Sequence, residues 1–168
     1  MDEREAIKQL IAESARHLSR QHYDDKQIEA AIAVVFGVDT GLIEDGTYFV
    51  AEDAGVLAGC GGWSKRKAVF GGDQYAGRDV AYIDPATDFA KIRAFFIHPD
   101  HARKGIARAI LTRCEDEARA EGFRGLELMS TLPGIEFYKS CGFVPAGTFD
   151  LDLIDGVKLE LVPMRKDL

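Results

Sequence analysis

One segment near the middle of the chain restricts the possible folds most, because it joins a strand to a helix through a short glycine-containing loop. Residues 91–97 favour a strand, and the His98–Asp100 turn with its proline ends it. A strong helical pattern then runs from about residue 102 or 103 to 121, with Gly122 as its C-terminal cap. The first amides of any helix lack partners inside it, so unpaired N–H groups are expected at this junction.

The segments on either side complete a mixed α/β order. Two N-terminal helices are predicted, one from the apolar periodicity of Ile7 to Leu18 and one capped by Asp24 or Asp25 and ended by the Gly37–Gly41 region. Further strands are predicted at 47–52, 56–64, 126–129 and twice within 143–165, with a short helix over 133–141. Gly59, Gly61 and Gly62 inside the second strand predict a bulge or a close backbone approach. Residues 65–88 are expected to form a long loop.

Composition indicates one soluble, folded domain over residues 1–168. The chain is 46% hydrophobic and 29% charged, a mixture that excludes disorder of the whole chain. It has neither a membrane-length apolar run nor a secretory signal at its start. Its three cysteines are an odd set without paired spacing, which argues against disulfides and a structural zinc site. We therefore expect a cytoplasmic protein with no metal and no membrane partner.

The charge of the chain limits its partners. The formal net charge is −7, whereas nucleic-acid binders usually present a basic face. Nucleic acid is therefore not expected as a partner, and small molecules or cationic partners are weakly favoured. A nucleotide-binding domain is disfavoured because both the P-loop pattern and the GxGxxG fingerprint are missing.

The beginning of the central helix has the properties of an anion site. Gly105 and Ala107 are small where a ligand must approach the backbone, and Arg103, Lys104 and Arg108 add positive charge. An ordinary amphipathic helix with a basic, solvated first turn explains the same residues equally well.

The segment around this loop resembles motif A of the GNAT superfamily of N-acetyltransferases, whose pattern is Arg/Gln-x-x-Gly-x-Gly/Ala. Gly105 and Ala107 match the two small positions, whereas Ala102 stands where the family has Arg or Gln. Downstream, residues 137–143 (FYKSCGF) resemble the second family signature, Tyr-x-x-x-Gly-Phe. The resemblance covers about residues 47–165 and includes the order of the elements.

The resemblance implies a fold, a co-substrate and an activity. The fold is a mixed α/β (α+β) central sheet flanked by helices, with a V-shaped splay between two central parallel strands. The family's usual first strand is missing here, which leaves an open sheet edge and suggests a homodimer. The implied activity is transfer of an acetyl group from acetyl-CoA (coenzyme A) to a primary amine of a small molecule or peptide. The alternative is a catalytically idle domain that binds acyl-CoA.

The resemblance also assigns residues. The backbone at the end of the first parallel strand would hold the pantetheine arm, the loop would hold the pyrophosphate, and Thr131 stands where many relatives have a cofactor-contacting Asn. Tyr138 matches the catalytic tyrosine that faces the sulfur, although as a residue alone it also suits a core aromatic. The expected cofactor-binding residues are Phe95, Phe96, Ile97, Arg103, Lys104, Gly105, Ile106, Ala107, Arg108 and Thr131.

The identity of the general base is left open. An alkylamine with a pKa near 10.4 needs about 4 to 5 kcal/mol to lose its proton at pH 7. Some relatives use a Glu at the position of Lys91, which cannot replace a carboxylate. Asp88, Glu127 or water remain as alternatives, and backbone carbonyls that select the neutral amine could serve instead of a base.

Other chemically suggestive residues have simpler explanations. Cys141 fits a small residue at a helix end better than a nucleophile, and His98 with His101 fits a turn better than a metal site. Four aromatic residues in and just before the 65–88 loop could line an acceptor pocket, form a lid, or only pack within the loop. They are Trp63, Phe70, Tyr75 and Tyr82.

Overall fold

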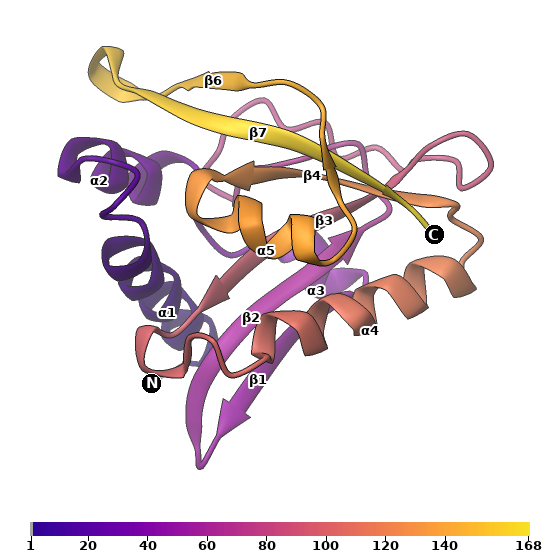
Figure 1. The fold of residues 1–168 in the computed structure, drawn as a ribbon, viewed down its shortest axis with the longest axis horizontal. Helices are drawn as coiled ribbons and strands as arrows, with labels where there is room; N and C mark the ends of the chain where they lie inside the picture. Colours follow the sequence, from indigo (N-terminus) through magenta and orange to yellow (C-terminus); the bar gives the residue numbers. More distant parts are fainter. Residues whose placement is uncertain (1) are drawn as a thin grey trace.

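Three helices precede the first strand in the computed structural model, which describes residues 2–168 (Figure 1). They are α1 (Glu3–Leu18), α2 (Asp25–Val34) and α3 (Thr40–Glu44). The predicted cap of α2 is confirmed, since the Asp24 side chain and the Gln27 side chain form a reciprocal capping box. Helix α3 was not predicted, and Gly41 lies inside it rather than ending the region, because the Asp39 side chain accepts a hydrogen bond from the Gly41 amide.

Seven strands form one sheet in the order β1-β2-β3-β4-β7-β5, with β6 also paired to β7. All pairs are antiparallel except β3 with β4. The strands are β1 (Tyr48–Asp53), β2 (Val56–Ser64), β3 (Ala90–Ile97), β4 (Gly125–Thr131), β5 (Val144–Pro145), β6 (Phe149–Asp152) and β7 (Lys158–Asp167). No strand precedes α1 within residues 2–168, and β1 is an edge strand, as expected.

The expected V-shaped splay lies between β3 and β4. Only two residue pairs join these parallel strands, Ala90 with Leu126 and Lys91 with Glu127. Beyond them β3 remains paired with β2, and β4 remains paired with β7 as far as Thr131. The sheet therefore opens between the carboxyl ends of its two central strands.

Helix α4 (Ile106–Ala120) begins later than predicted. Residues Pro99–His101 form a short 3-10 helix, and the chain then passes through positive φ at Arg103 (65°) and Gly105 (84°) before the α-helix begins. Those left-handed conformations exclude a helix start at residue 102 or 103. Gly122, also at positive φ, ends the helix region as predicted.

The glycines of β2 allow neighbouring groups to approach the strand. A Cβ at Gly59 would lie 2.8 Å from Ile97 Cδ1, one at Gly61 would lie 2.6 Å from the Phe95 ring, and one at Gly62 would lie 2.4 Å from the Thr47 carbonyl. The register of β2 against β3 also shifts between Cys60 and Gly62. The predicted close approach and bulge are both confirmed.

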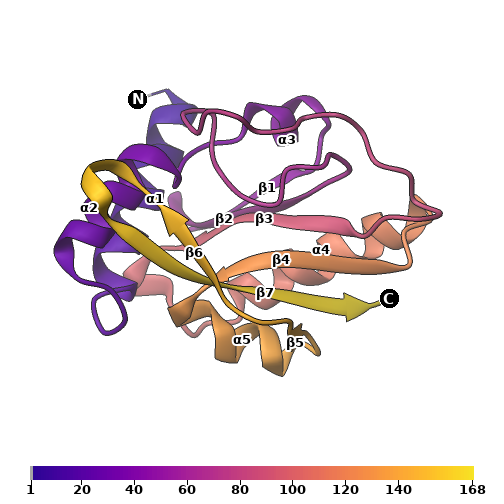
Figure 2. The same cartoon turned by 90° about the horizontal axis from the view of Figure 1, so that it is seen from above.

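Helices cover both faces of the sheet (Figure 2). Helix α4 packs a core on one face that includes Trp63, Leu111 and Tyr138, which lies on α5 (Ile135–Ser140). Helices α1 and α2 bury separate clusters around Ile11 and Ile28. The long loop predicted over residues 65–88 occupies residues 65–89, and it is irregular apart from an isolated bridge between Arg66 and Tyr82.

Candidate active site

A cavity of about 960 Å³ occupies the splay. From β3 it is bordered by Ile92 to Ile97, and from β4 by Leu128 to Thr131. Because it lies where the sheet opens, side chains from both faces reach it: Tyr138 and Arg108 from the α4–α5 face, and Phe36 from the face of α1 and α2. A splay between parallel strands is a common place for a ligand in an open sheet.

The loop before α4 presents an uninterrupted run of free backbone donors. None of the six amides from Arg103 to Arg108 donates a hydrogen bond within residues 2–168, whereas the next amide, Ala109, already bonds to the Gly105 carbonyl at 3.0 Å. Gly105 is the N-cap of α4, and a Cβ placed on it would meet nothing within 4 Å. The space in front of this end of the helix is therefore open. All of these residues except Lys104 border the cavity. The first turn of α4 carries no acidic side chain that would repel an anion.

Tyr138 lies where the resemblance expects it, on α5 at the border of the cavity. Its ring packs against Phe95, Phe137 and Phe143, with centroid distances of 6.3, 5.1 and 5.6 Å. Burial raises the pKa of the phenol well above its ordinary value. The hydroxyl therefore stays protonated at neutral pH and can donate a hydrogen bond.

The end of β3 borders the cavity through all three predicted residues, but their roles differ. The Phe95 ring faces Tyr138, and the Phe96 ring packs edge-on against Phe36 at 5.4 Å on the opposite face. The Ile97 amide already donates to Ser14 Oγ at 3.2 Å, so it is engaged with α1. Thr131 ends β4 on the other side of the opening.

Neither carboxylate considered as a base borders the cavity. Glu127 pairs with the buried ammonium of Lys91 and with Arg165 at 3.0 Å. Asp88 accepts a hydrogen bond from the Asp84 amide at 2.9 Å, inside the loop. The two carboxylates that do border the cavity are Asp39 and Glu136.

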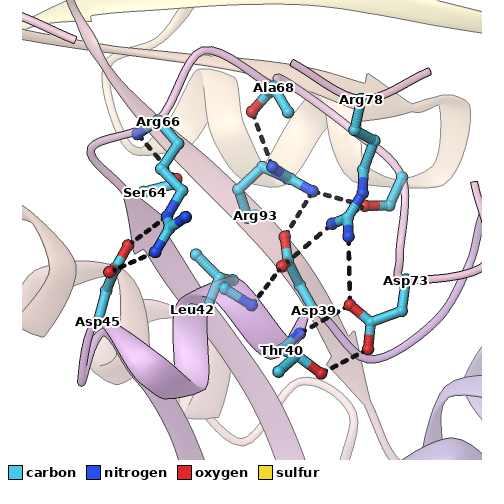
Figure 3. A network of polar contacts seen from close by, with 12 residues as sticks. Asp39, Thr40, Leu42, Asp45, Ser64, Arg66, Ala68, Asp73, Arg78 and Arg93 are labelled. Atoms are coloured by element: carbon cyan, nitrogen blue, oxygen red, sulfur yellow. Dashed lines mark hydrogen bonds and ion pairs between the residues drawn. The ribbon is translucent and has the colours of Figure 1, made fainter. Parts of the chain in front are cut away.

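Asp39 belongs to a buried polar network that sequence reasoning missed (Figure 3). It accepts from Arg93 on β3 at 2.8 Å and from Arg78 of the loop at 3.1 Å. Arg93 is 4% exposed, and burial lowers its pKa to about 10. One signal was available, because an arginine that precedes the apolar run Ala94–Ile97 in the middle of a strand needs a buried partner.

The four aromatic residues considered for a pocket or a lid have different roles. Phe70 borders the cavity and Tyr75 packs behind it at 5.3 Å. Trp63 is fully buried away from the cavity and donates to Glu117 Oε2 at 3.0 Å. Tyr82 is 61% exposed and bonds Asp45.

Two simpler explanations are supported. Cys141 follows the last residue of α5, as expected for a small residue at a helix end. His98 caps the short 3-10 helix of the turn, and His101 is the last residue of that helix. No group of three metal-ligating side chains occurs in the part of the chain that the structure describes. Across the same residues, 2–168, no helix has the length and apolar character needed to span a bilayer.

Comparison with known families identifies the chain. The model of the acetyltransferase (GNAT) family matches residues 5–143, which is most of the sequence. The chain belongs to the GNAT family. Its fold agrees with this membership.

Individual relatives are distant. An "IAA acetyltransferase" from Azospirillum brasilense is 26% identical over 148 residues, covering 86% of this chain and 81% of that protein. A crystal structure from Rhodopseudomonas palustris described as a GCN5-related N-acetyltransferase superposes with a TM-score of 0.73 at 18% identity, over 99% of this chain and 91% of that one. The PaiA N-acetyltransferase of Thermoplasma acidophilum, solved in complex with coenzyme A, superposes at 0.66 with 15% identity, over 98% and 92%. These structures share the fold of this GNAT protein.

Proposed function

We propose that this GNAT protein is an acetyl-CoA-dependent N-acetyltransferase that acetylates a primary amine by direct attack within a ternary complex. The observation that carries the proposal is the run of six unpaired amides from Arg103 to Arg108 at the edge of the cavity. Backbone donors at a helix N-terminus suit a diphosphate. The relative solved with coenzyme A is consistent with the same ligand here.

The residues present fit this co-substrate. The open space at Gly105 admits a phosphate close to the backbone, and the guanidinium groups of Arg103 and Arg108 add positive charge at the cavity. The Arg108 guanidinium also donates to Ser140 Oγ at 3.0 Å, which links the start of α4 to the end of α5. Lys104, the other cation of this loop, does not border the cavity.

The catalytic role falls to Tyr138. When bound, acetyl-CoA supplies the acetyl group as a thioester, whose C–S bond breaks as the amine nitrogen forms the new C–N bond. The raised pKa of Tyr138 keeps its proton in place, so the phenol stabilises the departing sulfur by donating a hydrogen bond rather than by giving up the proton early. Since Asp88 and Glu127 are engaged outside the cavity, water is the remaining acceptor among the three considered for the amine proton.

Two measurements test this function. Calorimetry measures acetyl-CoA binding without any acceptor, and a thiol assay then measures release of coenzyme A with a panel of primary amines. We expect binding and amine-dependent thiol release. Absence of binding would contradict the site, and binding without thiol release for any amine would favour the alternative, an idle acyl-CoA-binding domain. The absence of an unpaired carboxylate at the position of Lys91 is the observation that keeps this alternative open.

The homodimer and the cytoplasmic location remain proposals. The dimer is suggested by the edge position of β1. Sedimentation at micromolar protein tests it, and a mass near the 18.5 kDa of one chain would contradict it.

A further inference from the structure

The half of the cavity that faces α1 and α2 is lined differently from the half beside α4. Five apolar residues from three separate regions border it there, and four of them belong to a cluster with α2 that is separate from the core under α4. The five are Val35 and Phe36 after α2, Val69 and Phe70 of the long loop, and Leu161 of β7. If the α4 loop holds the diphosphate, this half is left for the acceptor.

The part of this wall formed by Val69 and Phe70 is held in place from both sides. The Arg93 guanidinium donates to the carbonyl of Ala68 at 2.7 Å and to the carbonyl of Gly71 at 2.6 Å (Figure 3 shows Arg93 between the loop and Asp39). These two carbonyls bracket the two wall residues in the sequence. The loop is thus tied to β3 by a buried side chain, and Phe70 has a defined position.

The next residues tie the same wall to the end of α2. The Gly72 amide donates to the Val35 carbonyl at 2.8 Å, and the Gln74 side chain donates to the Phe36 carbonyl at 2.8 Å. A Cβ on Gly72 would lie only 2.7 Å from the Gly37 Cα, so the two backbones are in close contact. The wall from α2 and the wall from the loop therefore form one continuous surface.

The Phe70 ring is supported from behind. Tyr75 and Phe149 of β6 pack against it with centroid distances of 5.3 and 5.9 Å. Phe70 itself is half-buried and borders the cavity. A ligand can pack against the flat apolar surface of an aromatic ring fixed in this way. The ring then loses little conformational entropy on binding, because it is already ordered.

The charges of this half do not suit a polycation. Its carboxylate, Asp39, is 4% exposed and accepts from Arg93, Arg78 and the Gly41 amide. The other carboxylate at the cavity, Glu136 on α5, pairs with Lys139 at 3.1 Å. A second or third ammonium group placed in this half would therefore lose its hydration without gaining a free carboxylate, because Glu136 lies exposed on α5, on the other side of the cavity.

We propose that the acceptor is an amine with an apolar, aromatic body, of the arylalkylamine class, and that Phe70 determines this specificity by packing against that body. Arg93 acts as a positioning residue that holds the Phe70 segment. The proposal rests on the proposed acetyltransferase function, because it needs the α4 half to be filled by the co-substrate.

The test compares two acceptor classes on the intact chain. Calorimetry measures binding of 2-phenylethylamine and of spermidine to the protein saturated with coenzyme A, and the thiol assay measures the KM of each. We expect 2-phenylethylamine to bind about ten-fold more tightly than spermidine. Equal or tighter spermidine binding, or no binding of 2-phenylethylamine, would overturn the proposal.

Two variants locate the effect. Phe70→Ala should raise the KM for 2-phenylethylamine about ten-fold and leave the KM for spermidine and for acetyl-CoA unchanged. Tyr82→Ala is the matched control, since it removes an aromatic ring from the same loop outside the cavity, and it should change none of these constants. Parallel losses for both amines in Phe70→Ala would mean a structural role only.

The coenzyme A titration, made before any amine is added, separates this proposal from the proposed function. If coenzyme A does not bind, the proposed function fails. If coenzyme A binds and spermidine is preferred, only the acceptor assignment fails.

Discussion

The two halves of the cavity are built in contrasting ways. The α4 half consists of backbone amides from six consecutive residues, Arg103 to Arg108, so its shape follows from local conformation. The acceptor half joins segments as distant as Val35 and Leu161, and it depends on the buried side chain of Arg93. We therefore expect ligand binding by the α4 half to tolerate most side-chain changes except those at Gly105. The acceptor half, in contrast, should lose its structure when the buried cation Arg93 is removed.

The largest effect is expected for Arg93→Ala. The change leaves Asp39 with less compensation, leaves the Ala68 carbonyl without its donor, and leaves the Gly71 carbonyl with Arg78 alone. We expect the free energy of unfolding to fall by about 3 to 5 kcal/mol, measured by urea denaturation. Arg16→Ala is the control, because both partners of the Arg16–Glu29 ion pair are exposed, so the change should cost only about 1 kcal/mol. Equal losses would remove the special role of Arg93.

Gly105→Glu should be the most damaging change in the other half. It places bulk and negative charge in the open space before the unpaired amides, so acetyl-CoA affinity measured by calorimetry should fall about 100-fold. Gly147→Glu is a matched control, since Gly147 also has positive φ (101°) and no atom within 4 Å of a Cβ but lies outside the cavity. Both variants should lose about 1 kcal/mol of stability, and only the first should lose affinity. Normal binding by Gly105→Glu would show that the loop assignment is wrong.

Tyr138→Phe should separate chemistry from binding. Removing the hydroxyl should lower kcat about ten-fold or more and leave acetyl-CoA affinity nearly unchanged, because only a hydrogen bond to the departing sulfur is lost. Burial raises the pKa of this phenol, so its protonated form persists above the ordinary tyrosine range and its ionisation should not limit activity below about pH 10. The wild type and the variant should therefore share the shape of their pH profiles up to that pH. An altered profile would assign a proton transfer to Tyr138.

The smallest effect is expected for Arg108→Ala. The guanidinium borders the cavity and bonds Ser140, but it is exposed and the neighbouring amides remain. We expect the KM for acetyl-CoA to rise about two- to three-fold, with a weaker dependence on salt. A loss as large as that of Gly105→Glu would mean that side chains, rather than amides, dominate this half.

Much of the fold was predictable because its signals are local. The Asp24 cap of α2, the turn between β1 and β2, and the close approach at the β2 glycines each depend on a few adjacent residues. The start of α4 was misplaced because apolar periodicity contains no information on the positive φ of Arg103. Helix α3 was missed because five residues carry too little periodicity, and a single side-chain cap at Asp39 supports it.

The two halves of the cavity also differ in how far the sequence predicts them. The unpaired amides follow from any helix N-terminus, so the α4 half could be predicted without tertiary information. The acceptor half could not, since Asp39 and Arg93 are far apart in the sequence and meet only through the fold. Whether Asp88 or Glu127 reaches the cavity was undecidable for the same reason, because the pairing of Glu127 with Lys91 depends on the register of β3 and β4.

The narrow junction between β3 and β4 has a consequence for how the molecule holds together. Residues 48–97 build one part of the sheet and residues 125–167 the other, and two rungs at Ala90 and Lys91 are all that connects them edge to edge. The cleft is thus the boundary between these two units of the sheet, and the Lys91–Glu127 end is where they remain joined. A molecule lying across that boundary would brace the two units against each other, so occupancy should be visible as slower amide exchange in the rungs themselves.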